Sequence, residues 1–300
     1  MLAPKLFAKC MLLLLAIPNC LALAQPQTEP PELLPAAEPS PVPTEIAEPP
    51  PVRLPREHHC WCHLEPGAWR TLRVTTETFD PGGQSLGVSV TSETETLSDV
   101  QDGHYALQSK SVVEIGGKKL SGPDRVHQLQ LLTDTADEAV RAVPQPPAQI
   151  NLDGRAIPCS VWRLTVRRSE RQLVHEVYYN DAIWPFVLRR EVVETSTQDS
   201  TNPLSTTRES VVRSNVPVAL DEKIVSGAHL HSVTETPAGR TERLEVHSAS
   251  VPGGLVSRST TEWDAQGHRI RWGTTELVEF GEAEKERRPL RRLLRRNRDR

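Results

Sequence analysis

The fold of this chain is decided by a pattern that occurs twice, as Thr75-Thr76-Glu77-Thr78-Phe79-Asp80-Pro81-Gly82-Gly83 and as Ser259-Thr260-Thr261-Glu262-Trp263-Asp264-Ala265-Gln266-Gly267. In each copy an extended run rich in β-branched residues leads to an aromatic residue, then Asp, two further residues and Gly. β-Branched residues favour strands, an Asp side chain can cap a turn, and glycine accepts a positive φ angle. Each copy therefore predicts a β-hairpin. The segments between the copies differ in length and turn chemistry, so the pattern does not predict a two-fold internal repeat.

Alternation of apolar and polar residues with period two continues through the body of the chain, for example in residues 162–166 and 184–188. About ten such runs, mostly adjacent in sequence, predict a mainly β fold. We expect long meandering antiparallel strands that form a curved sheet or half-barrel. One or two short helices are expected beside it, the best candidate being residues 134–143, which Pro144 would end.

The first 24 residues have the layout of a secretory signal peptide. Lys5 and Lys9 supply positive charge, residues 11–16 form an apolar core, and residues 22–24 give an Ala-x-Ala cleavage site. The apolar run is too short for a transmembrane anchor. A lipidated Cys20 is the alternative, although the residues before it are larger than a lipidation site usually has. The sequence therefore predicts an exported protein that is periplasmic, envelope-associated or secreted.

The mature chain divides into three segments by composition. Residues 25–57 are about one-third proline interleaved with glutamate, which predicts a disordered linker of polyproline character. Residues 58–281 form the expected antiparallel β domain, with a net charge of about −7. Residues 282–300 carry a net charge of about +5, so this basic tail differs electrostatically from the domain before it.

Reactive side chains are densest at the start of the body, where residues 58–63 read His-His-Cys-Trp-Cys-His. Thiolate and imidazole groups suit zinc or copper, so the candidate metal ligands are His58, His59, Cys60, Cys62 and His63. The spacing is neither that of paired Cys-x-x-Cys zinc motifs nor that of a Cys-x-x-Cys-His haem attachment site. No cofactor is predicted.

A disulfide is the competing interpretation of the cysteines. The exported chain would hold Cys60, Cys62 and Cys159 in an oxidising compartment. A bridge from Cys60 or Cys62 to Cys159 would close a loop of roughly 100 residues and would stabilise the fold by about 3 to 5 kcal/mol. The sequence favours this bridge over unpaired thiols and over a metal site.

No local signature of catalysis is present in the sequence. The Gly-x-Ser-x-Gly motif and phosphate-cradling glycine loops are absent. Carboxylates at Glu93, Glu95, Glu191 and Glu194 lie on Thr-rich strands, where solvent-facing decoration is more common than a general acid/base pair. The sequence therefore predicts that the protein is not an enzyme.

Three histidines form a second, weaker metal pattern. His229 and His231 lie two apart on one expected strand face, and His247 is expected across the hairpin from them. Such a His-x-His pair can bind a metal ion, but surface histidines usually do not.

The basic tail is rich in arginine and leucine. In a helix, three leucines would fall on one side and the arginines on the other; the arginines are Arg287, Arg288, Arg291, Arg292, Arg295 and Arg296. This arrangement predicts binding to an anionic membrane or an envelope polyanion, with a solvated, disordered tail as the alternative. Nucleic acid is not expected as a partner outside the cytoplasm.

Several motifs resemble those of uncharacterised exported bacterial β-rich proteins: Trp69 followed by residues 73–77, the segment 252–257, and the segment 274–278. This resemblance covers most of the body and implies no known activity. At the level of fold, long meandering strands in an exported protein are similar to the lipoprotein-carrier half-barrel of the bacterial cell envelope. That family holds acyl chains in an apolar concavity, which here would be lined by Leu164, Val166, Trp184, Phe186 and Leu188.

The sequence thus predicts a non-enzymatic exported or envelope-associated β-sheet protein with a binding or structural role. One alternative is a carrier of a lipid or other amphiphilic ligand in the concave sheet. Another is a metal-binding protein that uses residues 58–63. The oligomeric state is not predicted.

Overall fold

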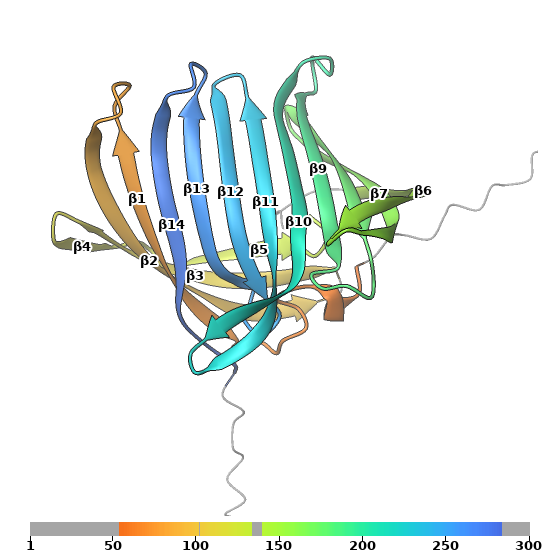
Figure 1. Cartoon of the computed structure of the whole chain (residues 1–300), viewed down its shortest axis with the longest axis horizontal. Coiled ribbons are helices and arrows are strands. Elements are labelled where there is room, and N and C mark those ends of the chain that lie inside the picture. Colours follow the sequence, from red (N-terminus) through yellow and green to blue (C-terminus); the bar gives the residue numbers. More distant parts are fainter. Residues whose placement is uncertain (1–53, 102, 134–139, 284–300) are drawn as a thin grey trace, which may run out of the picture. The chain divides into compact units, whose positions relative to one another are not determined.

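The computed structural model describes residues 54–101, 103–133 and 140–283. These residues form one 14-stranded antiparallel sheet that does not close into a barrel (Figure 1). Within this part of the chain the helical content is a single 3-10 turn, η1 (Arg56–His58). The mainly β fold predicted from the sequence is therefore confirmed.

The strands range from 4 to 18 residues in length. In chain order they are β1 (Trp69–Phe79), β2 (Ser85–Gln101), β3 (His104–Ile115), β4 (Lys118–Ser121), β5 (Arg125–Gln130), β6 (Val140–Leu152), β7 (Arg155–Arg168), β8 (Arg171–Tyr179), β9 (Val187–Ser196), β10 (Pro203–Leu220), β11 (Lys223–Thr236), β12 (Gly239–Ser248), β13 (Leu255–Asp264) and β14 (Arg269–Gly281).

The strand order in the sheet is β4-β3-β2-β1-β14-β13-β12-β11-β10-β9-β8-β7-β6, with β5 paired to β3. Strands that follow one another in the chain are therefore usually neighbours, as expected for a meander. There are two exceptions: β5 pairs with β3, and β1 pairs with β14, which joins the first strand of the domain to the last. Through this pairing, two meanders become one sheet.

The two copies of the Thr-rich pattern lie on β1 and β13, which flank β14 (Figure 1). Thr76 and Thr260 are both opposite Gly273, one from each side of β14. The same holds along the rest of the pattern, because residues 75–78 and 259–262 meet the same four residues of β14 in the same order. Corresponding positions of the two copies therefore lie at the same height in the sheet.

The turns that end the two copies are also built alike. The Asp80 carboxylate accepts a hydrogen bond from the backbone N–H of Gln84 at 2.8 Å, and the Asp264 carboxylate accepts one from that of His268 at 2.9 Å. In both turns the glycine lies in the left-handed region, with φ of 81° at Gly83 and 84° at Gly267. The two hairpins predicted from the sequence are confirmed.

These turn glycines give a direct test of the turn chemistry. Gly83→Ala and Gly267→Ala are each expected to lower the free energy of unfolding by about 1 to 2 kcal/mol, because a Cβ disfavours positive φ. No atom lies within 4 Å of the added Cβ at either position, so the cost should come from the backbone alone. Urea denaturation measures the loss, with the exposed turn variant Gln266→Ala as a control expected within about 0.5 kcal/mol of the parent. A loss in the control as large as that of Gly267→Ala would contradict this explanation.

The helix predicted at residues 134–143 is wrong where the structure describes it. Residues 140–143 belong to β6 and pair with β7, with Val140 opposite Val166 and Ala142 opposite Leu164. Residues 134–139 lie outside the described residues. Because β6 is an edge strand, its prolines remove no hydrogen bond from a central position of the sheet.

The segment that precedes β1 forms the centre of the first hydrophobic cluster. Trp61 and Cys62 pack there with Leu97 of β2 and with Tyr105 and Leu107 of β3. This segment has no apolar periodicity in the sequence, yet Trp61 is only 3% exposed. It therefore belongs to the core of the sheet and is not a continuation of the linker.

The same segment also reaches the other half of the sheet. The His58 ring stacks on that of Phe186 with 4.0 Å between ring centres, and its Nδ1 lies 2.5 Å from the hydroxyl oxygen of Tyr179. Nearby, Arg190 of β9 donates to the carbonyl of Leu132, which follows β5, at 3.4 Å. Since β3 with β5 and β8 with β9 are far apart in the strand order, these contacts require the sheet to curl. The segment before β1 lies between its two halves.

Two further clusters complete the core. One joins β6, β7, β9, β10 and β11 through Leu152, Cys159, Leu188, Val211, Ala228 and Leu230. The other joins the end of β10 to the loop between β12 and β13 through Val218, Leu220 and Val251.

Candidate functional site

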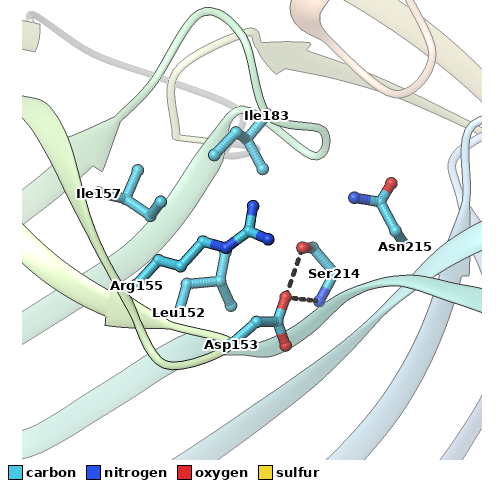
Figure 2. A pocket seen from close by; sticks show the side chains of 7 residues that line it. All are labelled: Leu152, Asp153, Arg155, Ile157, Ile183, Ser214 and Asn215. Atoms are coloured by element: carbon cyan, nitrogen blue, oxygen red, sulfur yellow. Dashed lines mark hydrogen bonds between the residues drawn. The ribbon is translucent and has the colours of Figure 1, made fainter.

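A pocket of about 320 Å³ lies where the β6–β7 turn reaches β10 (Figure 2). Its walls combine three aliphatic side chains with four polar or charged ones. The lining residues are Leu152, Asp153, Arg155, Ile157, Ile183, Ser214 and Asn215.

Local sequence explains how the two sides of the pocket form. Asp153 and Gly154, between β6 and β7, both have positive φ, at 52° and 75°, which is the geometry of a two-residue hairpin turn. Opposite this turn, the register of β10 with β11 shifts between Arg213 and Val216. Such a bulge leaves residues unpaired and re-aims their side chains.

Hydrogen bonds to Asp153 hold the turn on the bulge. Its carboxylate accepts from both the backbone N–H and the hydroxyl of Ser214, at 3.1 and 2.6 Å (Figure 2). These hydrogen bonds, the one from the Ser214 hydroxyl first, lower the pKa of Asp153. Asp153 thus holds the β6–β7 turn against β10, and its carboxylate is already hydrogen-bonded to Ser214.

Arg155 is the charged group that remains available in the pocket. Its guanidinium extends among the aliphatic side chains in Figure 2, and no ion pair or hydrogen bond engages it within the described part of the chain. Asn215 completes the polar side, since its Oδ1 accepts from Ser226 at 3.3 Å and its amide nitrogen faces the pocket (Figure 2). Asp153 also lines the pocket, but its carboxylate already accepts two hydrogen bonds from Ser214, which lower its pKa, and the charge of Arg155 lowers that pKa further. The pocket therefore offers a cation and a neutral donor beside an aliphatic wall, which suits a small anion with an apolar part.

The sequence contained one signal for this pocket that the hairpin analysis did not use. Asp153-Gly154 is a strong turn dipeptide. No signal of comparable strength marks Ser214 or Asn215, which lie within a long strand.

Loss of the Ser214 hydroxyl is expected to change the titration of Asp153. In Ser214→Ala the pKa of Asp153 should rise toward that of an ordinary aspartate, because its strongest hydrogen bond is lost. A group whose pKa is depressed in the folded state stabilises that state above its unfolded pKa, and loses this effect as pH falls. NMR titration of the Asp153 carboxyl carbon measures the shift, with Ser226→Ala as a neighbouring control, and an unchanged pKa in Ser214→Ala would contradict this role.

The structure does not bring the candidate metal ligands of residues 58–63 together. His58 and Cys62 have the separate partners described above. The ring of His59 lies 4.6 Å from that of Tyr105, and Nδ1 of His63 lies 2.8 Å from the carbonyl oxygen of His59. Across residues 54–101, 103–133 and 140–283, no group of three His, Cys, Asp or Glu side chains is placed to hold a metal ion. This arrangement does not support the predicted metal site.

The predicted disulfide to Cys159 is also absent from the structure. Cys159 is a buried thiol on β7 whose Sγ lies 3.7 Å from the carbonyl oxygen of Ile157, and burial raises its pKa. Cys62 packs in a different hydrophobic cluster, and Cys60 accepts a backbone hydrogen bond from Gly253 at 3.1 Å. Cys159 is separated from Cys60 and Cys62 because it packs in a different hydrophobic cluster from the segment before β1.

The histidine pattern is split between the two faces of the sheet. His247 is opposite Ala228, so it lies on the face away from His229 and His231. His231 instead contacts Glu242 on the neighbouring strand at 2.7 Å. The expectation that His247 joins the other two is therefore wrong, because the register places it one residue out of phase.

The candidate carboxylates are engaged by arginines or buried. Burial, then the charge of neighbouring Glu95, raises the pKa of Glu93. The remaining three form ion pairs: Glu95 with Arg70 at 2.7 Å, Glu194 with Arg171 at 2.8 Å, and Glu191 with Arg189. Their geometry is that of cross-strand and same-strand charge pairs.

The proposed acyl-binding face is occupied by protein. Leu164, Val166 and Leu188 are fully buried, and Trp184 and Phe186 are half-buried. Leu188 and Trp184 pack in the second hydrophobic cluster, and Phe186 stacks on His58. In the described part of the chain, these three side chains therefore contact protein where an open apolar concavity was expected.

The signal peptide, the linker as far as residue 53 and the six tail arginines lie outside the described residues, so export and binding by the tail remain predictions. Within the described residues, no helix reaches the length and apolarity needed to cross a membrane.

Fold and pocket together define an open, single-sheet antiparallel β protein with a small cavity beside one hairpin turn. Among solved structures, the chain is similar to a proposed exported protein with a YmcC-like fold from Bacteroides fragilis, at 10% identity and a TM-score of 0.30, covering 73% of this chain and 97% of the other. It is also similar to a proposed lipoprotein from Parabacteroides distasonis, at 13% identity and a TM-score of 0.31, covering 74% of this chain and 98% of the other. Neither description names the lipoprotein-carrier half-barrel, so that resemblance is not confirmed. No protein-family model and no curated protein matches the chain.

Proposed function

We propose that the protein is an exported, non-enzymatic binding protein whose pocket beside the β6–β7 turn takes a small carboxylate with an apolar tail. The observation that supports this most is the position of Arg155, a guanidinium among aliphatic side chains with no ion pair in the described residues (Figure 2). Arginine binds carboxylates through paired N–H groups, which combines charge with geometric selectivity.

The pocket walls would supply the rest of the binding energy. Burial of apolar surface contributes roughly 25 cal/mol per Å², and Leu152, Ile157 and Ile183 offer such surface beside the guanidinium. The volume is near the lower end of ordinary small-molecule pockets, so it favours a short tail over a full lipid chain. This distinguishes the proposal from a carrier that encloses a lipid within the sheet.

A series of ligands that differ only in length and head group tests the proposal. Straight-chain carboxylates from butyrate to decanoate, and the alcohols of matching length, would be titrated into the full chain by isothermal calorimetry. We expect affinity to rise with chain length until the pocket is full, and each alcohol to bind more weakly than its carboxylate. Absence of binding across the series, or equal binding of the alcohols, would overturn the proposal.

A further inference from the structure

A row of alternating aromatic and arginine side chains crosses the hairpin ends of four strands. It consists of Phe79 on β1, Arg269 on β14, Trp263 on β13 and Arg240 on β12, and is called the aromatic–arginine ladder below. The guanidinium carbon of Arg269 lies 4.3 Å from the centre of the Phe79 ring, and that of Arg240 lies 5.7 Å from the centre of the Trp263 ring. Trp263 is also the direct cross-strand partner of both arginines. The four side chains therefore share one face of the sheet.

The repeated sequence pattern determines where the two aromatic residues of the ladder lie. Phe79 and Trp263 are the aromatic residues of its two copies, and the shared register across β14 brings them to the same height. Adjacent strands lie about 4.7 to 4.9 Å apart, so one aromatic residue follows the other at roughly 10 Å, with Arg269 of β14 between them. Because Phe79 is only 8% exposed and lies under Arg269, the accessible part of the row is the half-buried Trp263 ring, with Arg240 and Arg269 on the strands beside it.

An open groove of about 520 Å³ continues the ladder between the β11–β12 and β13–β14 turns. Arg240 and Trp263 belong to both the ladder and the groove, whose other walls include Glu235, Thr236 and Asp264. The groove adds hydroxyl and carboxylate acceptors beside the aromatic ring.

The charge on the ladder is only partly compensated. Arg240 pairs with Glu242 at 3.3 Å. Arg269 is exposed and stacks on the Phe79 ring, and among the described residues it makes no ion pair. One cation of the row is therefore available to an anionic partner.

From this combination we infer that the ladder and its groove bind a carbohydrate chain that carries carboxylates. The C–H faces of sugar rings pack on aromatic rings, while the arginine guanidinium only donates hydrogen bonds and pairs with carboxylates. A sugar ring packed on Trp263 would place its neighbours in the chain beside Arg240 and Arg269, which are the cross-strand partners of Trp263. A membrane surface fits less well, because Phe79 is buried beneath Arg269 and presents no protruding apolar side chain. The inference is independent of the pocket, since it uses none of the pocket residues.

The test compares three polymers on the full chain: polygalacturonate, which is an acidic polysaccharide, neutral dextran, and polyglutamate, which carries carboxylates without sugar rings. We expect polygalacturonate to bind, dextran to bind more weakly, and Arg269→Gln to weaken polygalacturonate binding at least about tenfold. The tail can attract any polyanion, but it is the same in parent and variant, so the measured quantity is the difference between them. Trp263→Ala should also weaken binding, but Arg269→Gln carries the test because Arg269 is exposed and its loss should leave the fold intact.

A matched control separates the ladder from other exposed arginines. Arg208→Gln removes an exposed arginine on β10 that belongs neither to the ladder nor to the pocket, and it should leave polygalacturonate binding unchanged. The inference is overturned if polygalacturonate does not bind, if Arg269→Gln binds it as the parent does, or if dextran binds equally well. It is also overturned if Arg269→Gln weakens polyglutamate binding to the same extent, because the ladder would then recognise charge alone.

Discussion

Replacement of Trp61 by alanine is expected to lower the free energy of unfolding by about 3 to 5 kcal/mol, the cost typical of truncating a buried tryptophan. Trp61 is 3% exposed and packs with side chains of β2 and β3. The guanidinium carbon of Arg70 lies 5.1 Å from its ring centre, and a Cβ on Gly253 would come within 2.5 Å of the ring. These contacts leave little room for collapse, so the variant should retain a cavity.

Chemical denaturation of the full chain measures this loss. Trp272→Ala provides the matched control, because Trp272 lies on β14 with 36% of its surface exposed, and we expect a loss below about 1 kcal/mol. Equal losses in the two variants would contradict the placement of the segment before β1 inside the curled sheet.

Replacement of Glu245 by glutamine is expected to lower the free energy of unfolding by about 3 kcal/mol at neutral pH, the second large effect. The Glu245 side chain is 10% exposed and contacts both Arg258 and His247, each at 2.6 Å. Burial alone would raise its pKa, but the hydrogen bond from His247 and the charge of Arg258 outweigh burial and lower the pKa to about 2. Loss of this carboxylate leaves the half-buried Arg258 without its ion-pair partner.

The pH dependence of the effect follows from the direction of the pKa shift. Because the folded pKa lies below the unfolded one, the ionised carboxylate stabilises the fold fully above about pH 4.5 and progressively less as pH falls toward 2. The difference in unfolding free energy between the parent and Glu245→Gln should therefore shrink between pH 6 and pH 2.5. Urea titrations at several pH values measure it, with Glu242→Gln as a more exposed control expected to cost no more than about 1 kcal/mol. A difference that stays constant with pH would contradict the assignment.

Local sequence chemistry was sufficient to predict the mainly β fold and the two Thr-rich hairpins. The Asp and Gly positions of the two Thr-rich copies predict the hairpins, and both turns form with the expected capping and φ angles. The side-by-side arrangement of the copies could not be predicted, because it depends on the pairing of β1 with β14 at opposite ends of the domain. The aromatic–arginine ladder follows from that pairing and was missed for the same reason.

Contacts between distant residues account for the other differences. Residues 58–63 suggest a metal site when read alone, but His58 is held by Tyr179, 121 positions away, and Trp61 by the β2–β3 hairpin. The pocket depends on a hydrogen bond between Asp153 and Ser214, 61 positions apart, and on a bulge in β10 that no strong local signal marks. The prolines of β6 suggested the end of a helix, whereas the edge position of this strand tolerates them.

The role of the pocket depends on Arg155, and a titration of octanoate into the parent and into Arg155→Gln by isothermal calorimetry tests it most directly. Glutamine keeps much of the side-chain length and removes the charge, and the exposed position of Arg155 means that the fold should be retained. We expect octanoate to bind the parent and to bind Arg155→Gln at least about tenfold more weakly, while Arg269→Gln binds as the parent does. Equal affinity of octanoate for the parent and Arg155→Gln, or no binding to either, would contradict the account.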